Sequence, residues 1–513
     1  MSLTTNLTVD PAAYDGTRVG YFRYGAIGPR VLITTDTGEW HLLSRDEFDR
    51  FYQGKLDESE PLHAELARKG FLKGWIDVDK AVARVRRKRG FLGSGPHLHV
   101  VVATLRCNHA CKYCHASRTD MDRVDTDMSL ATARQVVDFA FQSPSPVVNF
   151  EFQGGEPTVN FPVIRFITEY AREKNRYESK ELLLSVVSNL TYMDDEKLAF
   201  LVDNGVMLCT SLDGPAEVHD QNRGWIGKGS SHATVTAWMD RFNQAWIDRG
   251  LDPNLFHVDA LMTTTRASLS HGRAIVDEYV RRGIKSIHLR PLNPFGFATA
   301  TWRQIGYSME EFLAFYKDTF EYILELNQRG VFIQERMAAM FLTKILTPDD
   351  PNYTDCRSPV GSGTATLAYN YDGAVYTCDE GRMTAHMGDE FFRLGHVAAS
   401  GWAEVAHHPT VKALAVASIT DALPACSTCM FKPSCGIQPL HNYKFDGDLF
   451  AQRPRSRKCQ EFYGVQAFLF DKLGNDADGG LEKIFRRWTI QRSRPGTIPW
   501  APGPTAPPSE GAV

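Results

Sequence analysis

The sequence predicts an α/β protein whose centre is an open, six-stranded partial (β/α)6 barrel, preceded by a small α+β module and followed by a cysteine-rich extension. Three observations lead to this prediction. Six strand-like apolar runs alternate with helical patterns between residues 97 and 330. A strand–turn–strand pattern followed by helical segments precedes them. Nine of the ten cysteines lie in two regions, 107–114 and 356–459.

Composition excludes several classes of protein. The net charge of −4 offers no general attraction to nucleic acid or to an anionic membrane. No stretch approaches the roughly 18 to 20 apolar residues that span a bilayer. The N-terminus lacks the basic and apolar parts of a signal peptide, so we expect a cytoplasmic protein with no nucleic-acid or membrane partner. Clustered cysteines in such a protein bind metal or do chemistry more often than they form disulfides.

Residues 1–90 are expected to form the N-terminal α+β module with a basic linker. Two alternating runs flank a turn at Gly25–Pro29, which predicts a hairpin. Ser44 is a candidate N-cap and Gly70 a candidate helix end. The basic stretch Ala81–Gly90 is expected to be a solvated linker helix, although its charge suits an acidic peptide as well.

Residues 97–330 are expected to form the partial barrel. Strands separated by helices imply a parallel sheet with crossover connections, and six of them are too few for a closed eight-stranded barrel. Active sites of such sheets lie at the carboxyl ends of the strands. Cys209 falls within a strand, where a core thiol is the expected role. The predicted strands are His99–Leu105, Val147–Phe152, Leu182–Ser188, Val206–Ser211, His257–Met262 and Ser286–Arg290.

Two further regions complete the chain. Residues 331–470 hold the second group of cysteines, in short and turn-rich segments. Residues 490–513 are rich in proline and glycine and are expected to be a disordered tail.

The first cysteine group has the spacing C-x3-C-x2-C and follows the first barrel strand directly: Cys107, Cys111 and Cys114. Thiolates are the usual ligands of iron–sulfur clusters. Three thiolates on a four-iron cluster leave one iron open to another ligand. A zinc loop is the alternative, with His109 or His115 as the fourth ligand.

Three further motifs accompany this loop: FEFQGGEP (150–157), VVSNLT (186–191) and TSLDGPAEVHDQNR (210–223). Together with the cysteine spacing, they make residues 97–330 resemble the radical S-adenosylmethionine (SAM) superfamily, and its peptide-modifying members in particular. The resemblance implies that Cys107, Cys111 and Cys114 hold a [4Fe–4S] cluster with SAM on its open iron. Reduction of that cluster yields a 5′-deoxyadenosyl radical.

The resemblance also implies roles for the residues around the cluster. Gly154, Gly155 and Glu156 would bind the SAM ammonium group. Glycines there let the backbone approach a ligand closely. The other expected SAM contacts are Ser188 and Asn189 near the ribose or carboxylate, Ser211, Arg223 at the carboxylate, and Tyr113 near the adenine.

The second group of cysteines resembles the SPASM extension of peptide and sulfatase maturases, over about residues 356–460. The resemblance implies one auxiliary [4Fe–4S] cluster on Cys426, Cys429, Cys435 and Cys459, for which structural zinc is the alternative. Pro439 stands where the family often has a further cysteine. Cys356 and Cys378 are therefore two ligands where four are expected, so a second auxiliary cluster is not expected unless other ligands complete it. Inert buried thiols are the alternative.

Asp379 follows Cys378 directly. In sulfatase-maturating relatives an aspartate at this position is the base that deprotonates the substrate, and a turn residue is the alternative. The N-terminal module resembles in outline the winged-helix domains that bind the leader of a precursor peptide, and a structural cap is the alternative.

The layout as a whole most resembles the radical SAM maturase of the His-Xaa-Ser peptide system. That resemblance implies a ribosomally made precursor peptide as substrate, a paired maturase, and an external electron donor of the flavodoxin or ferredoxin type. Two alternatives stay open: a sulfatase-type maturase that makes formylglycine, and a peptide-binding partner without catalytic activity.

Overall fold

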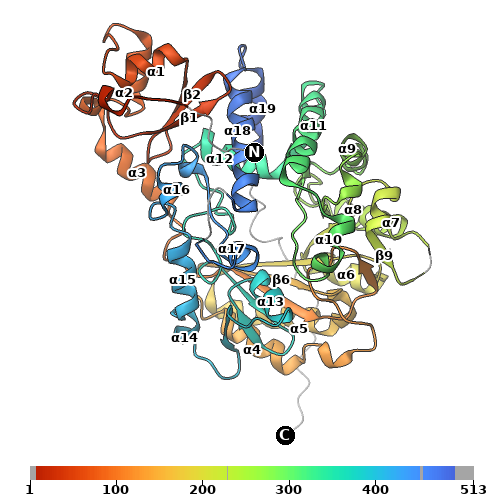
Figure 1. Cartoon of the computed structure of the whole chain (residues 1–513). Coiled ribbons are helices and arrows are strands. Elements are labelled where there is room, and N and C mark those ends of the chain that lie inside the picture. The colour runs from red at the N-terminus through yellow and green to blue at the C-terminus, as the bar shows by residue number, and fades with distance from the viewer. Residues whose placement is uncertain (1–6, 228, 451–454, 491–513) are drawn as a thin grey trace.

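The structure is a computed structural model, and it describes residues 7–227, 229–450 and 455–490 (Figure 1). The expected disordered tail therefore lies, from residue 491 on, outside the described residues. No helix in the described part of the chain has the length and apolar character needed to cross a membrane.

The N-terminal module is a three-stranded antiparallel sheet followed by helices. β1 (Arg23–Ile27) and β2 (Arg30–Thr34) form the predicted hairpin, with Gly28 at φ 55° in its turn. β3 (Trp40–Leu43) pairs with β2 and was not predicted. Three helices follow: α1 (Arg45–Tyr52), α2 (Pro61–Arg68) and α3 (Val78–Lys88).

The predicted helix signals of this module are confirmed. Ser44 caps α1 in a capping box with Glu47, in which each side chain accepts a hydrogen bond from the other residue's backbone N–H. Gly70 follows α2 with φ 76°, a conformation that favours glycine at a helix end.

Five predicted barrel strands form one parallel sheet in chain order: β4 (Leu98–Thr104), β6 (Val147–Gly154), β7 (Glu181–Ser188), β8 (Met207–Ser211) and β10 (Asp259–Leu261). The sixth, β11 (Ser286–Ile287), pairs instead with β12 (Gln334–Glu335) in a separate two-stranded sheet. The buried Glu335 explains the displacement, because its carboxylate accepts a hydrogen bond from the backbone of Leu289 (3.2 Å).

The C-terminal extension continues the barrel sheet on its other side. β13 (Thr366–Tyr369) pairs in parallel with β4, and β14 (Ala374–Tyr376) and β15 (Arg393–His396) follow as antiparallel strands. The extension is thus part of the same eight-stranded sheet as the barrel.

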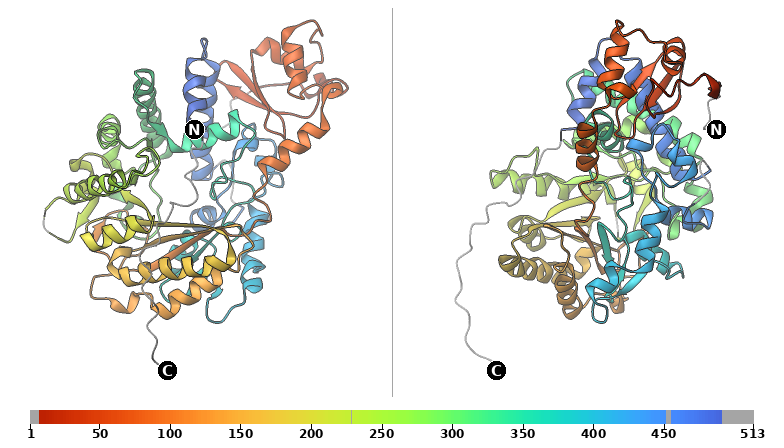
Figure 2. Two further views of the ribbon diagram at one scale, coloured as in Figure 1. Left: turned by 180° about the vertical axis from the view of Figure 1, so that it is seen from behind. Right: turned by 90° about the vertical axis from the view of Figure 1, so that its left-hand side faces the viewer.

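Helices cover this sheet and line the rest of the molecule (Figures 1 and 2). α4 and α5 lie below the sheet in Figure 1, and α11, α18 and α19 stand together above it. The helices from the barrel onward are α4 (Leu130–Ala140), α5 (Phe161–Glu178), α6 (Asp195–Asp203), α7 (Ala216–Asn222), α8 (Ser231–Asp248), α9 (Gly272–Arg281), α10 (Phe297–Ile305), α11 (Met309–Gln328), α12 (Arg336–Leu346), α13 (Asp379–His386), α14 (Trp402–Ala406), α15 (Pro409–Ala417), α16 (Pro424–Ser427), α17 (Pro439–Asp446), α18 (Arg457–Gly474) and α19 (Gly480–Trp488).

The N-terminal module is attached to the C-terminal extension. Trp40 Nε1 donates to the carbonyl of Ile345 (2.9 Å), and the Trp40 ring packs edge-on against Phe470. Thr34 Oγ1 donates to the carbonyl of Met430 (2.9 Å). These contacts join residues that lie about 300 to 400 positions apart in the chain.

The basic linker is the helix α3, as predicted, and none of its side chains is buried. Three arginines in α3 or directly after it form ion pairs with carboxylates from other parts of the chain. Arg84 pairs with Glu39, Arg87 with Asp349, and Arg89 with Asp421 (3.1 Å). The linker's charge is therefore largely used to hold the module against the extension.

Candidate functional site

A cavity of about 2210 Å³ occupies the open side of the barrel sheet. The carboxyl ends of the strands form one part of its wall, and the three cysteines of the first group, Cys107, Cys111 and Cys114, are exposed to it. The expected SAM contacts Tyr113, Gly154, Gly155, Ser188, Asn189, Ser211 and Arg223 also line this cavity. The tertiary structure thus brings together residues from four separate motifs.

The loop that carries the three cysteines is held by two later segments. β5 (His109–Cys111) pairs antiparallel with β9 (Arg223–Trp225), which sets Cys111 opposite Arg223. On the other side, the Phe297 backbone N–H donates to the carbonyl of Cys114 (2.8 Å). The loop is therefore fixed by backbone hydrogen bonds.

The two glycines at the end of β6 allow this loop to pass directly against the strand. A Cβ on Gly154 would lie 2.1 Å from the carbonyl oxygen of Thr104, and one on Gly155 would lie 2.3 Å from that of Leu105. Gly154 also has φ 142°, which favours glycine. Both positions require glycine because of the protein's own backbone.

Glu156 is fully buried and lies behind this wall. Its Oε1 accepts hydrogen bonds from the backbone N–H (3.1 Å) and hydroxyl (2.5 Å) of Thr158 and from the Ser188 hydroxyl (2.8 Å). Its Oε2 accepts one from the backbone N–H of Asn189 (2.7 Å). Burial raises the pKa of Glu156, and these four hydrogen bonds act in the opposite direction. The carboxylate thereby ties the end of β6 to the end of β7.

Asn189 connects β7 to the cysteine loop. Its Nδ2 donates to Oδ1 of Asn108 (3.0 Å) and lies 3.8 Å from Sγ of Cys107. Its Oδ1 accepts from the backbone N–H of Thr191 (2.9 Å). This side chain is placed to donate toward the sulfur of Cys107.

Asp213, which was not predicted as a site residue, lies fully buried at the bottom of the site. Its carboxylate lies 3.2 Å from Nε of Arg223 and accepts a hydrogen bond from the Tyr113 hydroxyl (2.6 Å). The Arg223 guanidinium also lies over the Tyr113 ring, 5.1 Å from its centre. The aspartate within the motif TSLDGPAEVHDQNR (210–223) was the available sequence signal.

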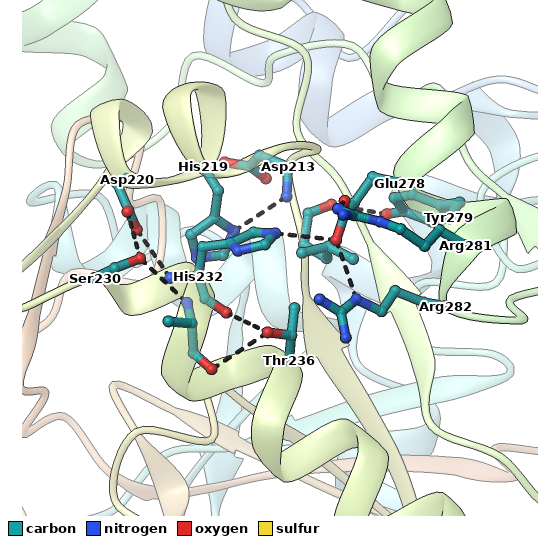
Figure 3. Close-up of polar contacts among 12 residues, drawn as sticks. Asp213, His219, Asp220, Ser230, His232, Thr236, Glu278, Tyr279, Arg281 and Arg282 are labelled. Atoms are coloured by element: carbon teal, nitrogen blue, oxygen red, sulfur yellow. Dashed lines mark hydrogen bonds and ion pairs between the residues drawn. The ribbon is translucent and has the colours of Figure 1, made fainter.

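A second layer of polar side chains supports Asp213 (Figure 3). The Asp213 backbone N–H donates to Nδ1 of His219 (3.3 Å), whose Nε2 lies 3.1 Å from the Ser231 hydroxyl. The neighbouring His232 lies 3.0 Å from the buried carboxylate of Glu278. Figure 3 shows Arg281 and Arg282 on the other side of Glu278, with which both form ion pairs. Both histidines therefore serve in local hydrogen bonding beneath the site.

The first three thiols suit an iron–sulfur cluster in their chemistry and position. Burial raises the pKa of Cys107, and raises that of Cys111 to about 12, with each thiol also affected by its neighbours in the group. A bound metal stabilises the thiolate and so overcomes this burial effect. Within residues 7–227, 229–450 and 455–490, no three His, Cys, Asp or Glu side chains converge on a single-ion site. Thiolates of a four-iron cluster bind separate irons and do not need such convergence.

The four thiols expected at the auxiliary site also lie within electrostatic range of one another. The pKa of Cys429 is raised to about 12, first by burial and then by Cys435, Cys459 and Cys426. α16 carries Cys426, the segment directly after it carries Cys429 and Cys435, and α18 carries Cys459. These thiols are a suitable donor set for a second cluster.

Cys356 and Cys378 lie in different surroundings. Cys356 belongs to the main core, and its pKa is raised first by burial and also by the nearby Cys435. It packs against Gly436, where a Cβ would lie 2.4 Å from the Cys356 carbonyl carbon. Cys378 belongs to a separate small apolar cluster with Val360 and Leu414. The structure places Cys356 near Cys435, one of the expected auxiliary thiols, and puts Cys378 in a different apolar cluster.

Asp379 begins α13 and lines the cavity. Its Oδ1 lies 2.7 Å from Nε of the buried Arg382, which in turn donates to the carbonyl of Ala116 (3.2 Å). The carboxylate is thus oriented toward the cysteine loop by an arginine.

Cys209 also faces the cavity, beside Ser211 on β8. The prediction that Cys209 is a core thiol is therefore wrong.

Comparisons with known proteins identify the fold. Residues 101–251 match the model of the radical SAM superfamily. An uncharacterized protein of Archaeoglobus fulgidus is 24% identical over 468 residues, which are 91% of this chain and 97% of that protein. The fold is that of the radical SAM maturases among the solved structures.

Two solved structures superpose on most of this chain. A histidine-tagged form of anSMEcpe with bound AdoMet superposes with a TM-score of 0.61 and 20% identity, over 77% of this chain and 98% of that chain. SuiB of Streptococcus suis, bound to the precursor peptide SuiA, superposes with a TM-score of 0.51 and 14% identity, over 86% of this chain and all of that chain (100%).

Proposed function

We propose that this chain is a radical SAM enzyme that modifies a ribosomally made peptide. The observation that carries the proposal is the meeting of three cysteine thiols, two glycines and a buried arginine at one end of a large cavity. Structures named for bound peptides support the peptide as substrate: native anSMEcpe with AdoMet and the Kp18Cys peptide, and SuiB with SuiA.

In this proposal Cys107, Cys111 and Cys114 hold a [4Fe–4S] cluster, whose open iron takes SAM. When bound, the pair supplies a 5′-deoxyadenosyl radical that abstracts a hydrogen atom from the peptide. Gly154 and Gly155 let the cysteine loop pass close against the end of β6, and Arg223 offers its guanidinium to the SAM carboxylate. Asp213 holds that guanidinium and the Tyr113 hydroxyl in place.

Cys426, Cys429, Cys435 and Cys459 hold one auxiliary [4Fe–4S] cluster in this proposal. An external flavodoxin or ferredoxin supplies electrons, and the reduced thiols suit the cytoplasm. The finer assignment is the maturase of the His-Xaa-Ser system, with a paired maturase as partner and the N-terminal module as the leader-binding part.

A sulfatase-type maturase that makes formylglycine is the second candidate. One observation favours it: Asp379 lines the cavity and is oriented by Arg382, as a substrate base would be. In this candidate Asp379 takes the proton from the substrate cysteine or serine.

The test begins with anaerobic reconstitution of the full chain. Iron analysis should give about eight irons per chain, because each four-iron cluster accounts for four. Incubation with SAM and a reductant should release 5′-deoxyadenosine, and the Cys107→Ala variant should release none. Mass spectrometry of a co-expressed neighbouring peptide then identifies the modification.

The variant Cys459→Ala serves as the matched comparison, since it should lose about four irons and keep SAM cleavage. Absence of deoxyadenosine from fully reconstituted protein would instead favour the peptide-binding partner. A count of about twelve irons would contradict the single auxiliary cluster.

A further inference from the structure

One part of the cavity wall carries two arginines, Arg290 and Arg336. Both line the cavity, on the side formed by β11 and α12. Among the residues that the structure describes, neither guanidinium makes a hydrogen bond or an ion pair. Arg290 is half-buried and Arg336 is exposed, so both guanidinium groups are accessible to an acidic group of a bound molecule.

The fold joins the two segments that carry these arginines. β11 and β12 are paired in parallel, with Ile287 opposite Glu335. The Glu335 carboxylate accepts hydrogen bonds from the Leu289 backbone (3.2 Å), from the Ala338 backbone (2.7 Å) and from the Tyr316 hydroxyl (2.6 Å). Glu335 therefore fixes the residue before Arg290 to the helix that begins with Arg336.

Both charges act on the same neighbouring groups. The pKa of His288 is lowered, first by burial and then by Arg336 and Arg290. The same two arginines favour the ionised form of Tyr353, although burial raises its pKa overall. His288 Nε2 is buried and has no hydrogen-bond partner. The two guanidiniums and this imidazole therefore surround one region of the cavity.

Several carboxylates also line the cavity. Most of them already have a partner of their own, or have a raised pKa that makes their charged form less stable. Asp259 lies 3.3 Å from Nε2 of His257, and Asp379 is paired with Arg382. Glu151 accepts a hydrogen bond from Gln153 (2.5 Å); burial raises its pKa, and Arg336 acts in the opposite direction without forming an ion pair with it. Asp355 and Glu380 also line the cavity, and their mutual repulsion raises the pKa of Glu380 after the effect of burial. The guanidinium groups of Arg290 and Arg336 can therefore attract an acidic group of a bound molecule.

This wall is close to the cysteine loop. The Phe297 backbone N–H, seven residues after Arg290, donates to the carbonyl of Cys114 (2.8 Å). The segment after Arg290 also touches the loop, because a Cβ on Gly296 would lie 2.8 Å from the carbonyl oxygens of Cys114 and His115. A group held by Arg290 therefore lies near the position at which radical chemistry is proposed.

We propose that Arg290 and Arg336 bind a carboxylate of the substrate peptide. This inference rests on the proposed function and names its substrate class: a peptide with an acidic side chain, or its own C-terminal carboxylate, beside the residue that is modified. Guanidinium groups bind carboxylates with two parallel hydrogen bonds, which would orient the peptide as well as attract it. No bond is made or broken in this step.

The test uses the full chain, reconstituted anaerobically with its clusters, and fluorescein-labelled heptapeptide pools. One pool has a central glutamate and an amidated C-terminus, a second has a central glutamine and an amide, and a third has a central glutamine and a free C-terminal carboxylate. Fluorescence anisotropy gives the affinity for each pool. We expect an acidic pool to bind at least about tenfold more tightly than the neutral pool, and the better acidic pool identifies the source of the carboxylate.

Three variants make the test specific. Arg336→Gln and Arg290→Gln should each reduce the preference to less than about twofold, and Arg336→Lys should keep part of it, because lysine retains the charge without the paired donors. Arg487→Gln is the matched control. Arg487 lines the same cavity, where it lies over the Phe332 ring, so its removal should leave the preference unchanged.

Two results would overturn the inference. In one, the wild-type chain binds the acidic and neutral pools equally. In the other, the arginine variants lose SAM binding, measured by equilibrium dialysis, while they keep the preference for acidic peptides. Failure of the proposed function itself is a separate observation, since wild-type enzyme would then release no 5′-deoxyadenosine.

Discussion

At the scale of single residues, the site depends on side chains that do not face the cavity. Asp213 is completely buried, and it holds both Arg223 and the Tyr113 hydroxyl. Glu156 is equally buried and joins two strand ends. A buried charge of this kind is costly to leave without a partner, so its replacement has a large effect.

The variant Asp213→Asn should unfold more easily than wild type by about 3 to 5 kcal/mol, because it leaves the Arg223 charge buried without a counter-charge. Tyr113→Phe removes only one hydrogen bond to the same carboxylate and should cost about 1.5 to 3 kcal/mol. Chemical denaturation of both variants measures the difference. Equal losses would mean that Arg223 does not depend on Asp213.

The glycine wall of the site gives a second prediction. Gly155→Ala should reduce iron incorporation strongly, since its new methyl group would lie 2.3 Å from the Leu105 carbonyl oxygen and displace the cysteine loop. Gly401→Ala is the control, because nothing lies within 4 Å of a Cβ there. Iron per chain and melting temperature are measured for each, and normal iron content in the first variant would contradict the close approach.

At the scale of secondary-structure elements, the N-terminal module and the auxiliary cysteine region are held together by a few specific contacts. Lys432, which lies between Cys429 and Cys435, is nearly buried and pairs with both Asp36 and Asp421. Asp36 follows β2 of the module, and Asp421 also pairs with Arg89 after α3. One lysine thus joins three parts of the chain.

Lys432→Gln should loosen this attachment. The two carboxylates are about half exposed, so we expect a loss of about 1 to 2 kcal/mol, less than for a fully buried pair. Limited proteolysis should then cleave the variant faster between the module and the barrel. The control is Arg86→Gln, which changes an exposed residue of the linker helix α3 and should behave like wild type.

At the scale of the whole molecule, one sheet runs from the barrel into the C-terminal extension. β4 carries the cysteine loop at its end and pairs with β6 on one side and β13 on the other. His99 lies in this strand, fully buried, with Nδ1 2.8 Å from the Tyr369 hydroxyl of β13. Its burial lowers its pKa to about 3, so the folded protein keeps it neutral.

This histidine makes stability depend on pH. Its folded pKa of about 3 lies below the unfolded value of 6.5, so the unfolded chain binds the proton first as the pH falls. The contribution is fully present above pH 6.5 and is lost between about pH 6.5 and 3, which amounts to about 2 kcal/mol between pH 7 and 5. Denaturant unfolding at the two pH values should show this loss, and His99→Gln should reduce it. An unchanged pH dependence in the variant would contradict the assignment.

Much of this structure was predictable from local patterns in the sequence. The alternation of apolar residues predicted five strands of the main sheet, and Ser44, Gly28 and Gly70 marked the ends of elements through their own backbone preferences. The spacing of Cys107, Cys111 and Cys114 indicated a candidate cluster-binding loop because it reflects positions within one short segment.

Other features were not predictable in this way. The sixth strand left the main sheet for β12, and β13 took a place beside β4, because pairing depends on which distant edges meet in space. Cys209 turned toward the cavity although its strand pattern indicated a core position.

The sequence by itself therefore determined the identity of the chemical groups: the thiols of the loop, the glycines beside it, and the alternation that forms the sheet. Only the tertiary structure decided how these groups are partnered. It set Asp213 under Arg223, Cys356 beside Cys435, and both Arg290 and Arg336 on the wall of one cavity. The physical reason is that local periodicity encodes backbone conformation, whereas burial and charge pairing arise between segments far apart in the chain.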